Sequence, residues 1–252
     1  MNDRFPASRL ALLCLLTILT GCSYWQTPRA ASSLAPANQR SPYDDSTLHR
    51  TALPVLMPYN RIISPAGHTI VYGDPGVENH SLDVRLVPGT PLLAVEDRYG
   101  IALLDTLSRR PVARWAYADD ARYAGFMSTY SGLKVRQQAG ETQLYWSAAN
   151  GKTHQSCVLE AAYSAGRISI RRAFAFAPVA APLALPNELA LTTEAGRDFL
   201  YVVLNGNNQL VKLDLATGQP VWTKPTGVAP YGLAIADHGN AHSHRPNQER
   251  HA

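Results

Sequence analysis

The chain has 252 residues, 46% of them hydrophobic and 17% charged, so it is long and apolar enough to build a core, and its 17 Gly and 18 Pro residues suit a turn-rich β protein. Its formal net charge of +4 is small and its basic residues are scattered, which excludes the dense basic surface of a nucleic-acid-binding protein. Glycine-rich phosphate loops and paired zinc motifs are absent, and we therefore expect no nucleic-acid partner and no cofactor.

Residues 1–21 predict a signal peptide. Arg4 and Arg9 precede an apolar segment, residues 10–19, which is too short to span a bilayer as a helix. The segment ends in the sequence LTGC at residues 19–22, which resembles the lipobox of bacterial lipoproteins. The resemblance implies cleavage before Cys22, a diacylglycerol thioether on the Cys22 sulfur and acylation of the new amino terminus.

The residues after the signal peptide predict where the protein resides. Ser23, at the second mature position, resembles the sorting signal of outer-membrane lipoproteins. Several acyl chains at Cys22 would give a stable anchor in the lipid bilayer. Residues 22–56 are rich in Ala, Ser, Pro, Gln and Arg, which is typical of a flexible tether. We therefore expect a protein of the bacterial cell envelope, lipid-anchored in the outer membrane and facing the periplasm, whose folded domain covers residues 57–241.

A four-stranded β unit is predicted from residue 188 to residue 222. Apolar runs of strand length alternate there with turns rich in Asn and Gly, such as residues 205–208, and Asn and Gly tolerate the positive φ angles of tight hairpin turns. The predicted strands lie around Leu189 and Leu191 and at residues 199–204, 209–214 and 220–222. This pattern is typical of one blade of a β-propeller.

An internal repeat supports this interpretation. Residues 82–84 and 93–95 match residues 189–191 and 200–202, each 107 positions later, and residues 104–105 and 111–112 match residues 213–214 and 220–221, each 109 positions later. The later copy thus carries two extra residues, which we assign to the turn at residues 205–208. A further start at Leu233 follows Leu189 by 44 residues, within the roughly 40–50 residue period of propeller blades. Residues 121–178 fill the space of one more, less regular blade.

The fold class predicted is therefore all-β, a partial β-propeller of about three to four blades with four antiparallel strands each. After Ala241 the repeat pattern stops, and we expect residues 242–252 to form a disordered, His-rich tail. The strand at residues 233–236 would then lack a hairpin partner. His242 and His244 could bind a metal ion adventitiously, but no selected metal site is assigned to them.

The blade residues resemble a known family. The segment LYVVLNGNNQLVKLDLATGQPVW with VAPYGLAIA resembles the YVTN-type repeat of YncE-like β-propellers. The segment PAGHTIVYGDPGVENHSLD resembles the opening of a subgroup in which the propeller precedes an alkaline-phosphatase-type phosphoesterase domain. The resemblance implies seven blades in a complete ring, whereas this chain departs from the pattern at His242. It carries over no catalytic residue.

Two functions from different classes follow. The first is a non-catalytic binding or scaffold module that takes a protein or small-molecule ligand at the propeller face and associates with other copies through its open blade edge. The alternative is the N-terminal fragment of a propeller-phosphoesterase whose catalytic domain is missing here. Phosphoesterases of that type need clustered Asp and His ligands around a Ser or Thr nucleophile, and the folded region shows no such cluster in its sequence.

Candidate site residues are few. Glu78, Asn79 and His80 with Asp83 form a compact polar group that either binds a ligand or caps the turn before the strand at residue 82. Cys157 lies among small and apolar residues, and we expect it to be buried rather than reactive. The tryptophans at 115, 146 and 222 either stack on a ligand or, as we favour, pack between blades.

Overall fold

The computed structural model describes residues 68–70, 72–74, 76–77 and 79–236, and the backbone of the strands at residues 55–57, 61–63 and 241–244. The signal peptide, Cys22 and Glu78 lie outside the described residues. The chain divides into two compact units, residues 1–69 and 70–252. In the first unit, β1 (Val55–Met57) pairs with β2 (Arg61–Ile63) in antiparallel fashion. No helix of the described residues is long and apolar enough to cross a membrane.

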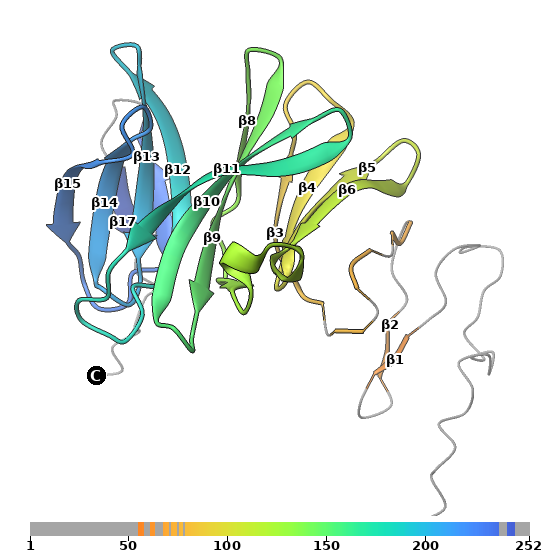
Figure 1. The fold of residues 1–252 in the computed structure, drawn as a ribbon, viewed down its shortest axis with the longest axis horizontal. Coiled ribbons are helices and arrows are strands. Elements are labelled where there is room, and N and C mark those ends of the chain that lie inside the picture. The colour runs from red at the N-terminus through yellow and green to blue at the C-terminus, as the bar shows by residue number, and fades with distance from the viewer. Residues whose placement is uncertain are drawn as a thin grey trace, which may run out of the picture. The chain divides into compact units, whose positions relative to one another are not determined.

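The second unit consists of three antiparallel sheets and one strand pair, which lie side by side in Figure 1. The first blade contains β3 (Ser81–Leu86), β4 (Leu92–Asp97), β5 (Gly100–Asp105) and β6 (Arg110–Ala116). The second blade contains β7 (Met127–Ser128), β8 (Lys134–Gln138), β9 (Glu141–Asn150), β10 (Gln155–Ser164) and β11 (Arg167–Phe176). The third blade contains β12 (Pro186–Glu194), β13 (Arg197–Leu204), β14 (Gln209–Asp214) and β15 (Pro220–Pro225). The prediction of an all-β partial propeller is confirmed.

The first and third blades repeat each other as the sequence predicted. Both contain the same irregularity between their last two strands, where Leu104 faces Pro111 and Leu213 faces Pro220 next to a register shift. The turn after β4 contains two residues between Asp97 and its partner Gly100, whereas the turn after β13 contains the four residues 205–208. The two extra residues therefore lie in the predicted turn.

The first strand of each blade departs from the predicted register. The repeat matched Leu82 with Leu189 and Val95 with Val202. In the structure Leu189 pairs with Val202, whereas the residue that pairs with Val95 is Val84 and not Leu82. The match is therefore wrong by two residues. A shift of two keeps every side chain on its own face of the sheet, so the apolar pattern alone does not detect it.

The second blade has a broken first strand. β8 pairs with residues 141–145 of β9 and β7 pairs with residues 148–149, so two short strands share one edge of β9. The prediction of an irregular blade between residues 121 and 178 is confirmed, and the break at residues 129–133 is the irregularity. Two short 3₁₀ helices, η3 (Tyr117–Asp119) and η4 (Ala121–Tyr123), connect this blade to the first.

The strand pair after the third blade corrects a prediction. β16 (Gly232–Ile235) pairs with β17 (Ala241–His244), with Leu233 opposite Ser243 and Ala234 opposite His242. The expectation that this strand lacks a hairpin partner was wrong, and the first three residues of the predicted disordered tail belong to β17. A strand without apolar alternation can still pair, because main-chain hydrogen bonds do not depend on side-chain type.

Apolar side chains fill the spaces between blades. Trp115 of the first blade packs edge to face against Trp146 of the second, with ring centroids 5.6 Å apart. Tyr145, on the other face of β9, packs against the third blade. Trp222 packs on Tyr201 within the third blade. Trp115 and Trp146 therefore pack between blades as expected, and Trp222 packs against the apolar cluster that the third blade shares with Leu233 and Ile235 of β16.

Cys157 lies in the same interface between the first and second blades. It is buried, and burial raises the pKa of its thiol to about 12. The expectation of a buried cysteine is confirmed, and at neutral pH its sulfur carries a proton.

Candidate functional site

The four residues predicted as a polar group have different surroundings. Glu78 lies outside the described residues. The Asn79 side-chain amide donates to the carbonyl oxygens of Asp74, at 2.7 Å, and of Val77, at 3.1 Å, and so holds the preceding turn. His80 is exposed at the start of β3. Asp83 extends its carboxylate to another blade.

Asp83 anchors the break in the second blade. Its Oδ2 accepts hydrogen bonds from the backbone N–H groups of Leu133, at 3.2 Å, and Gly132, at 3.4 Å. Both donors belong to the segment between β7 and β8. Gly132 has φ +116°, and a Cβ there would lie 1.9 Å from the carbonyl oxygen of Asn187, so only glycine fits. The Asp83 carboxylate therefore accepts hydrogen bonds from two backbone N–H groups that have no strand partner, because the pairing with β9 is interrupted there.

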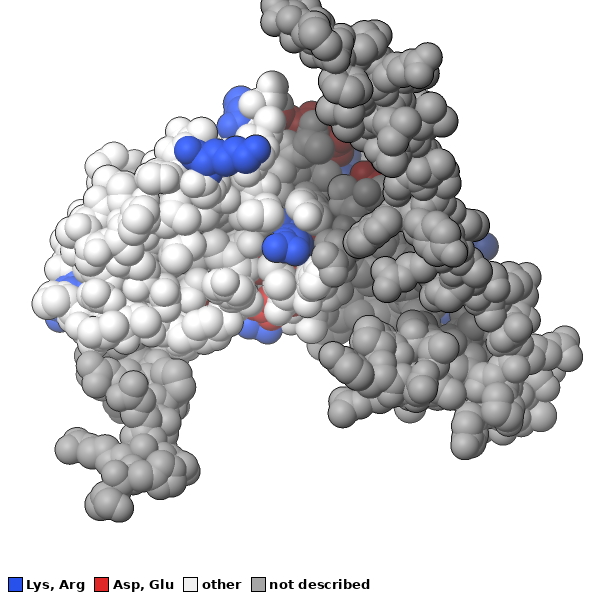
Figure 2. All heavy atoms as spheres, turned by 90° about the horizontal axis from the view of Figure 1, so that it is seen from below, with Lys and Arg blue, Asp and Glu red and all other residues white. Residues whose placement is uncertain are grey.

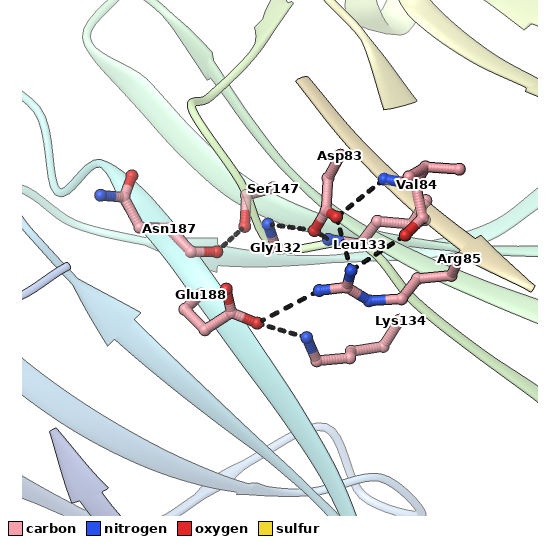
Figure 3. Close-up of polar contacts among 9 residues, drawn as sticks. All are labelled: Asp83, Val84, Arg85, Gly132, Leu133, Lys134, Ser147, Asn187 and Glu188. Carbon is pink, nitrogen blue, oxygen red and sulfur yellow. Dashed lines mark hydrogen bonds and ion pairs between the residues drawn. The ribbon is translucent and has the colours of Figure 1, made fainter. Parts of the chain in front are cut away.

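Charged side chains from the first strand of each blade meet at this point (Figure 3). Arg85 of β3 lies 2.7 Å from the Asp83 carboxylate and 3.9 Å from that of Glu188 on β12. Lys134 of β8 pairs with the same Glu188 carboxylate. We name Asp83, Arg85, Glu96, Lys134 and Glu188 the inner-strand cluster. It joins all three blades through ion pairs.

Glu96 is the fully buried member of this cluster. It faces Asp83 directly across the pairing of β3 with β4, its side chain is fully buried, and neither carboxyl oxygen has a hydrogen-bond partner among the described residues. Burial raises the pKa of Glu96 well above its ordinary range, and the negative charges of Asp83 and Glu188 raise it further, while Lys134 and Arg85 oppose the shift. Its surroundings therefore favour the protonated, neutral form of the Glu96 carboxyl group.

Buried polar contacts join the second and third blades beside the cluster. The Ser147 hydroxyl donates to the carbonyl oxygen of Asn187 at 2.7 Å, and the Thr129 hydroxyl donates to the carbonyl oxygen of Pro186. The Asn187 side-chain oxygen is buried without a partner among the described residues. The start of β12 is thus fixed to the broken strand by hydrogen bonds to its backbone.

A hollow of about 540 Å³ lies beside the cluster. Its wall is formed by residues 134–136 of β8, residues 189–193 of β12, and Leu233 and Ile235 of β16. Successive side chains of a strand point to opposite faces, so a wall that contains five consecutive residues of β12 runs along the edge of that strand. β12 pairs with β13 alone among the described strands, and its free edge therefore lines the hollow.

The described residues contain no group of three or more His, Cys, Asp or Glu side chains arranged to hold a metal ion. His242 and His244 lie on β17, where the backbone alone is described, so the prediction of adventitious metal affinity stays a prediction.

Comparison with known proteins shows distant structural similarity alone. No family model and no curated protein matches the chain. A solved structure of a Bacteroides caccae protein of unknown function has a TM-score of 0.45 at 15% sequence identity, over 72% of this chain and 56% of that one. A structure of luciferin-regenerating enzyme has a TM-score of 0.42 at 14% identity, over 66% of this chain and 56% of that one. The chain spans 56% of the length of each, and similarities this distant assign neither a family nor an activity.

Sequence reasoning found one charged member of the cluster and missed the other four residues. Asp83 was named because it lies near other polar residues in the sequence, whereas Lys134 and Glu188 lie about 50 residues further along the chain or more. One signal was present in the sequence. Lys134 and Arg136 alternate with Val135, and Asp83 and Arg85 alternate with Val84 in the same way.

Proposed function

We propose that this chain is a lipid-anchored binding module of the bacterial envelope, related to the YVTN-type propellers, which holds an extended segment of a partner protein along β12. The lipobox-like residues 19–22 and Ser23 support the anchor and its outer-membrane location. The repeated blade sequences support the family relationship. Nothing in this proposal requires catalysis by the blades.

The observation that carries the binding role is the free edge of β12 beside the hollow of about 540 Å³. A strand edge offers unpaired main-chain donors and acceptors, and an extended peptide binds such an edge by adding a strand to the sheet. The apolar side chains of Leu233 and Ile235 would contact alternate side chains of the bound segment. Lys134 and Arg136 also line the hollow, paired with Glu188 and Asp198, and an acidic residue of the bound segment would extend these ion pairs.

Site-specific crosslinking tests the binding role. A photoreactive amino acid at Thr192, which lines the hollow, should crosslink to an extended segment of a partner in intact cells, whereas the same residue at the exposed Thr217 should not. The double change Lys134→Glu with Glu188→Lys keeps an ion pair but exchanges its charges, so it should weaken the Thr192 crosslink without unfolding the blades. Equal crosslinking from both positions would contradict the proposal.

The anchor is tested separately. The variant Cys22→Ala should accumulate with its signal peptide attached, because cleavage of a lipoprotein precursor follows lipidation of the cysteine. Mass spectrometry of the wild-type protein should show an acylated N-terminal Cys22 in the outer-membrane fraction. An unmodified Cys22 would refute the anchor and leave the binding role of the blades untouched.

A further inference from the structure

A second hollow opens at the opposite end of the blades. Its volume is about 350 Å³, and its walls come from five segments of the sequence. They are residues 80–82 with His80 and Leu82, the turn between β4 and β5 with Arg98, the broken strand with Met127 and Tyr130, the end of β9 with Ala149 and Gly151 beyond it, and the chain before β12 with Leu183 and Leu185. A volume of this size suits a small organic molecule.

Arg98 is the charged group that distinguishes this hollow. Its guanidinium lies 5.9 Å from the ring centroid of Tyr99, and among the described residues neither a carboxylate nor any other acceptor lies within bonding distance of it. The neighbouring Asp97 is engaged elsewhere, since it accepts a hydrogen bond from the Tyr99 N–H and lies 3.9 Å from Arg114. Arg85, Arg114, Arg122, Arg136, Arg171, Arg172 and Arg197 all have a carboxylate partner.

The rest of the wall is largely apolar. Leu82, Leu183 and Leu185 are half-buried, while Met127 and Tyr130 are 37% and 67% exposed. Figure 2 views the molecule from below Figure 1, and the described atoms visible there belong mostly to uncharged residues, with isolated Lys and Arg side chains and a few Asp or Glu atoms among them. A half-buried cation beside apolar side chains favours a ligand that has one anionic group and an apolar body.

Leu185 is held in a strained conformation at this wall. Its φ is +47°, in the left-handed region that a bulky side chain rarely adopts. The backbone is fixed by its neighbours, since the Asn205 N–H donates to the Leu185 carbonyl oxygen at 2.9 Å and the Leu185 N–H donates to the Ser156 hydroxyl at 3.4 Å. Strained residues are concentrated at ligand sites, where surrounding contacts keep a side chain in place.

We propose that this hollow is a binding site for a small organic carboxylate, with the guanidinium of Arg98 bound to the carboxylate and the apolar body of the ligand packed between Met127, Leu183 and Leu185. The site is distinct from the free edge of β12 and does not depend on the proposed function. The proposal assigns a role to Arg98, which lines the hollow and has no carboxylate partner among the described residues.

Titration calorimetry on the full chain tests the proposal with 4-phenylbutyrate as the probe and its neutral amide, 4-phenylbutanamide, as the matched control. We expect saturable binding of the carboxylate to one site and binding of the amide at least tenfold weaker, since a guanidinium–carboxylate pair is a charge-assisted interaction. Butyrate, which has the same anionic group and less apolar surface, should also bind more weakly than 4-phenylbutyrate.

Two variants locate the site. Arg98→Gln should weaken 4-phenylbutyrate binding by about tenfold or more, while Arg110→Gln, an exposed arginine with the same change of charge, should bind as the wild type does. The Arg98 side chain makes no hydrogen bond to the described residues, so its replacement should leave the thermal midpoint unchanged. Absence of saturable binding, equal affinity for the amide, or unaltered binding by Arg98→Gln would each overturn the proposal.

Discussion

Glu96 makes the stability of the blades sensitive to pH. Its folded pKa is raised well above its ordinary value of 4.5 by burial and by Asp83 and Glu188, so the folded protein binds this proton more tightly than the unfolded chain does. The resulting stabilisation is complete below the ordinary value and is lost as the pH rises toward and through the raised pKa. Between the two values, each pH unit costs about 1.4 kcal/mol.

The variant Glu96→Gln should remove this dependence because glutamine has no proton to lose. We expect its thermal midpoint to exceed that of the wild type by an amount that grows as the pH rises above 5, until the pH passes the raised pKa of Glu96. Asp119→Asn, at an exposed carboxyl group, serves as the control and should show a constant difference over the same range. A difference for Glu96→Gln that does not change with pH would mean that Glu96 is ionised in the folded protein.

Gly132 permits the contact between the broken strand and β12. Gly132→Ala should lower the free energy of unfolding by more than about 2 kcal/mol, because the strain of its φ angle adds to a clash with the backbone of Asn187. Gly140→Ala is the matched control. Gly140 has φ +78°, and no atom lies within 4 Å of the position that a Cβ would take there, so strain alone should cost about 1 kcal/mol. Urea unfolding of both variants measures the difference, and equal losses would show that the clash is relieved.

At the scale of single elements, the turn after β13 that contains the two extra residues forms a joint, by which we mean that it is hydrogen-bonded to the segment between the second and third blades. The buried Asn207 accepts a hydrogen bond from the Val179 N–H at 2.8 Å and donates one to the Ala177 carbonyl oxygen at 2.9 Å, so this turn holds the chain that leads from the second blade to the third. Asn207→Ala should destabilise the protein by about 1–3 kcal/mol, since both backbone groups lose their partner. The exposed Gln219→Ala should change the unfolding midpoint little, and a similar effect of both would contradict the role of the joint.

The strands and turns of the first and third blades were predictable because each is encoded locally, by an apolar run and an adjacent turn such as residues 205–208. The register of β12 was not, since a shift by two residues preserves the alternation of faces. The function of the turn as a joint was also hidden, because Asn207 bonds to residues about 30 positions earlier. The inner-strand cluster was not predicted for the same reason, because its ion pairs with Glu188 form only when Arg85, Lys134 and Glu188 are brought together from three blades.

At the scale of the whole second unit, the middle blade couples its neighbours. β9 directs Trp146 toward the first blade and Tyr145 toward the third, and both side chains are fully buried. The inner-strand cluster joins the three blades at the same time. Loss of one interface therefore removes support from the other, and we expect the three blades to unfold in one cooperative transition.

Trp146→Ala and Leu200→Ala test this coupling, one in each interface. Each should lower the midpoint of a single transition, with losses of about 3–5 kcal/mol for the tryptophan and about 2–5 kcal/mol for the leucine, because each leaves a cavity among buried side chains. Leu107→Ala, whose side chain is 78% exposed, should have almost no effect. Near-ultraviolet and far-ultraviolet circular dichroism should report coincident urea transitions for every variant. Two separate transitions, with Trp146→Ala shifting one and Leu200→Ala the other, would show instead that the blades are independent units held together by the chain alone.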